Sequence, residues 1–142
     1  MAKKLNPTQF VKAVTRSFMA ESGLEPRLLG PHFRILSATE GRVDFELDIH
    51  KDHTNRLKMI HGGTIASMVD LGGSLAVAST GRFATGVSTD LNVGKTLAYT
   101  TITFTNSKGQ LAARGSHTKY VTGTMGEAGP FVAPAEFSED VE

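Results

Sequence analysis

Residues 53–70 read HTNRLKMIHGGTIASMVD, and this stretch organises the rest of the chain. A polar loop gives way to His61-Gly62-Gly63, and an apolar-rich helix is predicted over residues 63–80. Two glycines at a helix start allow another group to approach the backbone closely, at the positive end of the helix dipole. Such a terminus can hold a developing oxyanion without a cationic side chain. Asp70 follows about two helical turns later, and a carboxylate on a mostly apolar helix is costly unless it has partners or a task.

The composition is that of one ordinary globular domain. The chain has 142 residues, of which 39% are hydrophobic and 20% charged, enough for a single core. Neither end carries a dense basic cluster with aromatic residues, so we expect no nucleic-acid partner. The absence of cysteine excludes a thiol nucleophile, and no apolar run reaches the length that membrane insertion requires. We expect a cytoplasmic protein, with the mitochondrion as the alternative because the N-terminus is basic and weakly amphipathic.

The first half of the chain predicts one helix and two strands. Asn6-Pro7 provides a cap and a first-turn proline for a helix over about 7–22, which Gly23 can end. Residues 33–39 form a strand candidate. Residues 43–49 alternate apolar and polar side chains strictly, as a half-buried antiparallel strand does.

The second half continues with strands around the central helix. Gly72 and Gly73 inside that helix predict a sheet packed closely against it, because glycine costs about 1 kcal/mol there relative to alanine. Strands are predicted over 85–93, 96–105 and 110–121. One helix against a mostly antiparallel sheet is an α+β arrangement, so residues 1–121 are predicted to form a single domain. From residue 122 to 142 Gly, Pro and acids dominate without periodicity, which predicts a flexible acidic tail.

Short motifs follow the central stretch in a definite order. They are His53-Thr54-Asn55, His61-Gly62-Gly63, Asp70, Gly86-Val87-Ser88-Thr89-Asp90-Leu91-Asn92, Gly94-Lys95-Thr96-Leu97-Ala98-Tyr99 and Gly115-Ser116-His117-Thr118-Lys119. In this order they resemble the hotdog-fold acyl-CoA thioesterases, in the branch of the phenylacetate-pathway enzymes and thioesterase superfamily member 2. The resemblance covers about residues 5–121 and implies an antiparallel sheet wrapped around a central helix. It also implies hydrolysis of an acyl-CoA by a homodimer, paired further into a tetramer.

The resemblance also implies a role for each site residue. Asp70 would be the general base or, alternatively, the nucleophile, and Ser88 would help to place the attacking water. The Gly62 N–H and the Asn55 side chain would hold the thioester carbonyl, and His61 would support their loop. Such a site needs a positioned water, a base and an oxyanion site, and neither a metal nor another cofactor. The neighbouring Gly63 and His53 are expected to contact the substrate.

Each of these residues also has a structural interpretation. His61 could close a turn, Asp70 could be a buried structural carboxylate, Asn55 could be a turn residue, and Ser88 could be a small strand residue. His53 and His61 lack a suitably spaced third ligand for a metal. The whole domain could instead be a non-catalytic acyl-CoA-binding or dimerisation module of hotdog fold. A hotdog hydratase or dehydratase usually pairs a carboxylate and a histidine differently.

The chain departs from the resembled family near Val93-Gly94. In that family a loop and a further strand, about twenty residues, separate the two segments that meet here almost directly. Family topology makes those two strands run in the same direction without being neighbours, and two linking residues reach only about 7 Å. We therefore expect either that residues are missing near Val93-Gly94 or that the sheet has rearranged. Consecutive Cα distances near 3.8 Å from Leu91 to Thr96 would favour the rearrangement.

Overall fold

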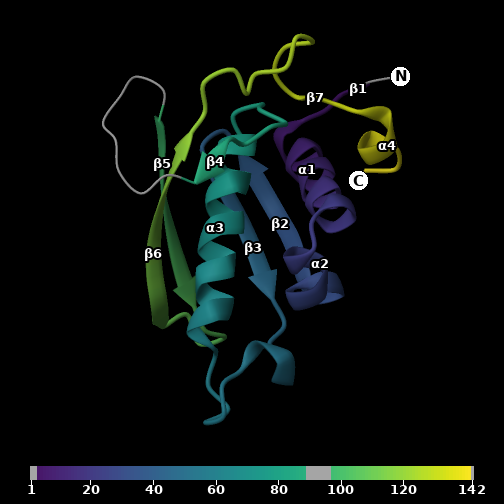
Figure 1. Ribbon diagram of the computed structural model, residues 1–142. Helices are drawn as coiled ribbons and strands as arrows, with labels where there is room; N and C mark the ends of the chain where they lie inside the picture. Colours follow the sequence, from purple (N-terminus) through teal and green to yellow (C-terminus); the bar gives the residue numbers. More distant parts are fainter. Residues whose placement is uncertain (1–2, 89–96, 142) are drawn as a thin grey trace.

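The centre of the protein is one long helix, α3 (Gly62–Ala78), as the sequence predicts. The computed structural model describes residues 3–88 and 97–141. Figure 1 shows α3 in the middle of the molecule, with β2 (Phe33–Thr39) and β3 (Arg42–Leu47) on one side of it. On the other side lie β5 (Leu97–Thr105) and β6 (Leu111–Tyr120). The sheets therefore curve around the helix on which the predicted site residues lie.

The described strands form three separate sheets. In the first, β2 and β3 pair antiparallel through the turn at Gly41, where φ is 81° and favours glycine. In the second, β6 lies between β5 and β4 (Val87–Ser88) and is antiparallel to both. The third joins β1 (Lys3–Lys4) to β7 (Val132–Ala133). No hydrogen-bonded ladder links the first two sheets within the residues that the structure describes.

Helix α1 (Pro7–Glu21) confirms the predicted N-terminal helix and covers β2. Asn6 and Gln9 form a capping box, in which the Asn6 side chain accepts from the Gln9 N–H at 2.9 Å. The inward face of α1 is fully buried, with Phe10 and Val14 both 0% exposed. The short helix α2 (Leu24–Leu28) and two 3₁₀ turns, Gly30–His32 and Lys51–His53, complete the connections on this side.

The small residues of α3 admit close contacts from the neighbouring elements, as predicted. A Cβ on Gly72 would lie 3.0 Å from the ring of Phe45 on β3 and 3.2 Å from Ile102 on β5. A Cβ on Gly73 would lie 2.6 Å from His117 Nδ1 on β6. Both contacts are tighter than a side chain tolerates without a shift of its neighbours, so the helix keeps glycine where the strands approach.

The C-terminal segment differs from the flexible tail predicted over 122–142. Strand β7 pairs with β1, and α4 (Ala135–Ser138) follows it against α1. Phe137 and Val141 are buried at 9% and 7% exposure, and the Phe131 ring lies edge-on to Phe10 with centroids 5.6 Å apart. Irregularly spaced apolar side chains fill a hollow beside α1, so the segment packs without any periodicity that a sequence pattern could reveal.

The strands of the second half agree with the sequence except at β4. The predicted strands over 96–105 and 110–121 correspond to β5 and β6. Alternation predicts a strand over 85–93, of which Val87–Ser88 is strand in the described part. The predicted test of chain continuity from Leu91 to Thr96 lies outside the described residues.

Candidate active site

Asp70 lies within polar contact of a histidine that comes from the sheet. His117 Nε2 on β6 lies 3.2 Å from Asp70 Oδ1 on α3, and the histidine side chain is 9% exposed. The aspartate side chain is 53% exposed and borders an open groove of about 500 Å³. This groove is lined by Ala66, Val69, Asp70, Gly115, Ser116 and His117. One oxygen of Asp70 is therefore held by the sheet while the carboxylate stays accessible to a small molecule.

A buried lysine lies one tier further along the same helix and strand. Lys119 is two residues after His117 on β6, and Ser74 is one turn after Asp70 on α3. Lys119 is 4% exposed, and its Nζ donates to Ser74 Oγ at 2.8 Å. Burial lowers the pKa of Lys119 below its ordinary value, and the charge of Asp70 opposes this shift. A positive charge thus lies beneath the groove on the same side as the carboxylate.

The start of α3 offers one backbone donor to the outside. His61 caps the helix, because its Nδ1 accepts from the Gly63 N–H at 2.8 Å. The next two N–H groups, from Thr64 and Ile65, donate to the His61 carbonyl. The Gly62 N–H donates to no group among the described residues, and a Cβ there would meet nothing within 4 Å. Gly62 therefore presents an accessible N–H at the positive end of the helix dipole.

Asn55 organises the loop that leads to this helix start. Its Oδ1 accepts from the N–H groups of Leu57 at 2.9 Å and Met59 at 3.2 Å. The loop is closed behind it by the bridge between Thr54 and Ile60. The side-chain oxygen of Asn55 is thus used within the loop, and its amide nitrogen is the group that remains for a ligand.

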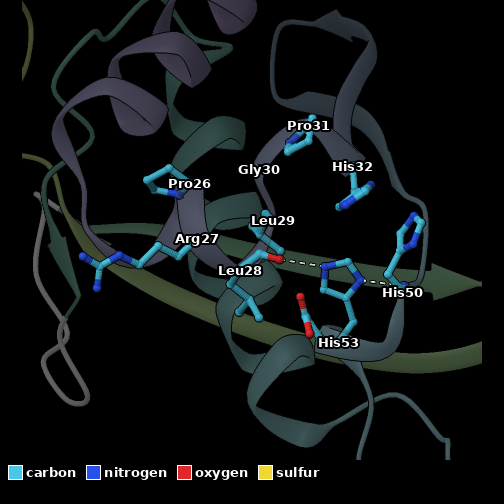
Figure 2. A pocket seen from close by; sticks show the side chains of 10 residues that line it. Pro26, Arg27, Leu28, Leu29, Gly30, Pro31, His32, His50 and His53 are labelled. Carbon is cyan, nitrogen blue, oxygen red and sulfur yellow. Dashed lines mark hydrogen bonds between the residues drawn. The ribbon is translucent and has the colours of Figure 1, made fainter.

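His53 lies in a different environment from the groove beside Asp70. It is 1% exposed, and its Nε2 lies 2.7 Å from the Leu28 carbonyl while its Nδ1 accepts from the His50 N–H at 2.9 Å. Figure 2 shows both bonds, with His53 turned toward the end of α2 and the rings of His32 and His50 nearby. The cavity here measures about 70 Å³. Both ring nitrogens of His53 contact backbone groups of the chain. His53 therefore connects the site loop to the end of α2.

The remaining predicted residues do not converge on Asp70 within one chain. Gly62 and Asp70 are eight residues apart on one helix, which corresponds to about 12 Å along its axis. Ser88 pairs through its backbone with Lys119 in β4–β6, and its side chain lies outside the described part. The structure therefore brings Gly62, His61 and Asn55 to one end of α3, and Asp70 to its middle.

Comparisons with known proteins identify the family. Human acyl-coenzyme A thioesterase 13 is 33% identical over 136 aligned positions, covering 80% of this chain and 96% of the human protein. A protein of the fission yeast Schizosaccharomyces pombe is 34% identical, covering 83% of this chain and 86% of that protein. This chain belongs to the thioesterase superfamily. In a comparison with models of protein families, none matches the chain.

Solved structures of the superfamily confirm the predicted fold. Zebrafish thioesterase superfamily member 2 superposes with a TM-score of 0.70 at 32% identity, covering 82% of this chain and 99% of its own. The mouse protein gives a TM-score of 0.68 at 28% identity, covering 82% and 98%. Escherichia coli PaaI, at 18% identity and a TM-score of 0.61, shares the fold. The α+β hotdog fold and the branch that the motifs predict are therefore confirmed.

In the sequence, His117 and Lys119 stand out only as part of a motif, which gives neither a place beside Asp70. Both lie on β6 two residues apart, so the alternation of a strand places them on the same face. The alternation does not tell which face of β6 is turned toward α3. Only the packing of β6 against α3 brings His117 to Asp70.

Residues 3–88 and 97–141 contain neither a metal-ligand cluster nor a membrane-spanning helix. No group of three His, Cys, Asp or Glu side chains there is arranged to hold a metal ion. No helix in the same ranges has the length and apolar character needed to cross a membrane.

Proposed function

We propose that this chain hydrolyses acyl-CoA thioesters to a free acid and CoA. Its relatives named acyl-coenzyme A thioesterase support the reaction class. The observation that carries the proposal is Asp70, a half-exposed carboxylate that borders an open groove and is held from behind by His117. A carboxylate restrained in this way and still reached by water suits a general base.

In the proposed mechanism Asp70 takes a proton from a water molecule as the water oxygen attacks the thioester carbonyl carbon. Ser88 would help to place that water. The carbonyl oxygen becomes an oxyanion, which the Gly62 N–H and the amide nitrogen of Asn55 would stabilise. Collapse of the tetrahedral intermediate breaks the carbon–sulfur bond, and the departing CoA sulfur takes up the proton that Asp70 holds, which restores the carboxylate. His117 would orient the carboxylate, and no step requires a metal.

Spacing along α3 supports a site built from two subunits. A base and an oxyanion donor that serve one carbonyl carbon lie within a few ångströms of it, whereas Gly62 and Asp70 of one chain are about 12 Å apart along the helix. We therefore propose a homodimer in which Gly62, Asn55 and His61 of one protomer face Asp70 and Ser88 of its partner. Gly63 supports this arrangement by holding the capping side chain of His61.

The first test of the proposed function is Asp70→Asn. This change keeps the shape of the side chain but removes the base, and turnover should fall about 10²–10⁴-fold. Thiol release from a panel of acyl-CoAs, compared with the wild type at equal folded content, measures it. Near-wild-type turnover in folded Asp70→Asn would contradict the role of Asp70. A wild-type chain that binds acyl-CoA without hydrolysing any would instead be the non-catalytic module.

The second test addresses the shared site. Asp70→Ala and Asn55→Ala are each expected to be inactive, and in a mixture about half of the exchanged dimers should carry one intact site. Thiol release after subunit exchange should therefore recover to roughly a quarter of the wild-type rate, since each hybrid has one working site of two. Mass spectrometry of the mixture confirms exchange. No recovery despite exchange would show that each site is built from one chain.

A further inference from the structure

Among the residues that the structure describes, the strands around α3 fall into two sheets, and β3 and β5 each have one free edge. In the described part of the chain β3 pairs only with β2, and β5 pairs only with β6. In an antiparallel ladder alternate residues turn their N–H and C=O groups away from a given partner. About half of the backbone polar groups of β3 and β5 therefore point toward each other across a slot, which we define as the space between β3 and β5.

Strand β5 has the composition of an interior strand. It reads LAYTTITFT, which is rich in threonine, aromatic and β-branched residues and holds neither a charge nor a proline. Edge strands usually carry charges, prolines or bulges that discourage further pairing. In β5 the ladder with β6 is irregular only between Phe104 and Thr105, at its last residue. A strand of this kind with one neighbour is expected to have a second.

The inward-facing side chains of β3 are less buried than those of β2, whereas Ile102 on β5 is 6% exposed. Phe33, Ile35 and Ala38 on the outer strand β2 are 7–8% exposed. On β3, which should be the more central strand, the inward-facing Val43, Phe45 and Leu47 are only partly buried. The ring of Phe45 meets that of Phe104 on β5 with centroids 6.4 Å apart. Phenylalanine side chains can meet in this way from strands about 10 Å apart, which is the spacing left by one absent strand.

The strand directions also leave room for one antiparallel strand. Figure 1 shows the arrows of β3 and β5 pointing the same way, toward the end of the molecule where α3 begins. A single strand between them would run antiparallel to both, which is the pairing found elsewhere in the two sheets. Adding it would join the two sheets into one sheet around α3.

The chain path points to the place where such a strand would enter. Val87 on β4 and Leu97 on β5 both lie opposite Tyr120, so the two strands begin at the same level of the sheet. A strand over 85–93, which the alternation predicts, would end about 20 Å beyond that level. Four residues from 93 to 97 span at most about 14 Å. The predicted strand and β5 are compatible only in a chain with more residues between them.

The relatives carry additional residues within the aligned regions. The alignment with the S. pombe protein runs over 140 positions but takes in 83% of this chain, about 118 residues. The alignment with human acyl-coenzyme A thioesterase 13 runs over 136 positions and takes in 80%, about 114 residues. In both cases about 22 positions of the relative lack a counterpart here, enough for one strand of about ten residues and its turns.

We infer that one further β-strand can occupy the slot. The relatives supply this strand from a segment of about 22 residues, which the 142-residue chain lacks. The segment enters between Ser88 and Leu97. It pairs antiparallel with β3 on one side and β5 on the other, and it covers Phe45 and Phe104. The 142-residue chain therefore has an open edge that a chain carrying the segment does not have.

The experiment compares three chains: the 142-residue chain, a chain with the S. pombe segment inserted between Val93 and Gly94, and a matched chain with a Gly/Ser segment of equal length at the same place. Amide hydrogen exchange is followed in peptides that cover β3 and β5. The S. pombe segment should slow exchange of the amides that face the slot by at least about 100-fold, and the Gly/Ser segment should leave their exchange unchanged. The urea midpoint should rise with the S. pombe segment only.

Equal protection by the two inserts would overturn the inference. So would exchange of the slot-facing amides of β3 and β5 in the 142-residue chain as slow as in the chain with the S. pombe segment, because the slot would then already be filled. If the 142-residue chain is insoluble, the comparison of the two inserted chains still decides. None of these readouts uses catalysis, so they are independent of the outcome of the Asp70 experiments.

Discussion

The two sides of α3 differ in how completely their cores are closed. On the side of α1 and β2, Phe10 is 0% exposed and lies between the rings of Phe83 and Phe131, at 6.3 and 5.6 Å. On the open side, which β3, β5 and β6 form, Phe45 lies between the rings of Phe33 and Phe104, at 5.1 and 6.4 Å, yet stays partly exposed. Similar aromatic neighbours thus give full burial only where a second layer covers them.

This difference separates stability from activity within one small domain. The closed side holds both ends of the chain together, since β1 pairs with β7 and α4 packs on α1. The open side carries the groove, Asp70 and His117. We expect core substitutions on the closed side to act mainly on folding, and those near the groove to act mainly on turnover.

The largest expected effect tests this contrast with one substitution at two places. Phe10→Ala should lower the free energy of unfolding by about 3–5 kcal/mol, the cost of removing a fully buried phenylalanine. Phe45→Ala should cost only about 1–2 kcal/mol, because water already reaches part of its ring. Urea unfolding with equal m-values measures both. Equal losses would contradict the contrast, and in a chain with the inserted strand the loss at Phe45 should approach that at Phe10.

A smaller effect is expected at Lys119, a buried cation on the open side. Its pKa is lowered by burial, so between that lowered pKa and its ordinary 10.5 the unfolded chain binds a proton that the folded protein does not. The free energy of unfolding should therefore rise with pH across that window, while below it the cost of burying the charge is fully present.

Lys119→Met removes this cost and should stabilise the protein by about 1 kcal/mol at pH 7 while abolishing the rise toward pH 10. Urea unfolding at both pH values checks this expectation. Ser74 keeps its own bond to the Asp70 carbonyl at 3.0 Å, so the substitution need not leave its hydroxyl unpaired. A Lys119→Met protein less stable than the wild type at pH 7 would show that the open side depends on that charge.

Much of the fold follows from local patterns in the sequence. The strict alternation over 43–49 predicts β3, and Asn6-Pro7 predicts the start of α1, because these signals depend only on neighbours a few residues away. The pair of glycines after His61 likewise predicts the start of α3 and the histidine cap. The roles of the candidate site residues came instead from the resemblance to the thioesterases, which gave no distances between them.

Other features depend on contacts between distant segments. The C-terminal segment carries no periodic pattern, and it packs against α1 because Phe137 and Val141 are buried in the core there. The partner of Asp70 could not be read from its surroundings in the chain, since His117 is 47 residues away and reaches it only when β6 packs on α3. His53 stands in the same motif as Asn55, yet the fold turns it toward Leu28.

The sequence by itself determined the two long helices α1 and α3 and the strands β2, β3, β5 and β6, and it indicated an unpaired backbone N–H at the start of α3. These properties arise from dihedral preferences, capping and side-chain period, which act over a few residues. The tertiary structure alone decided that His117 restrains Asp70, that Lys119 is buried close by, and that β3 and β5 belong to separate sheets in the part of the chain that the structure describes. Each of these depends on which surfaces meet, and burial and pairing between distant segments are not encoded in any single stretch of the chain.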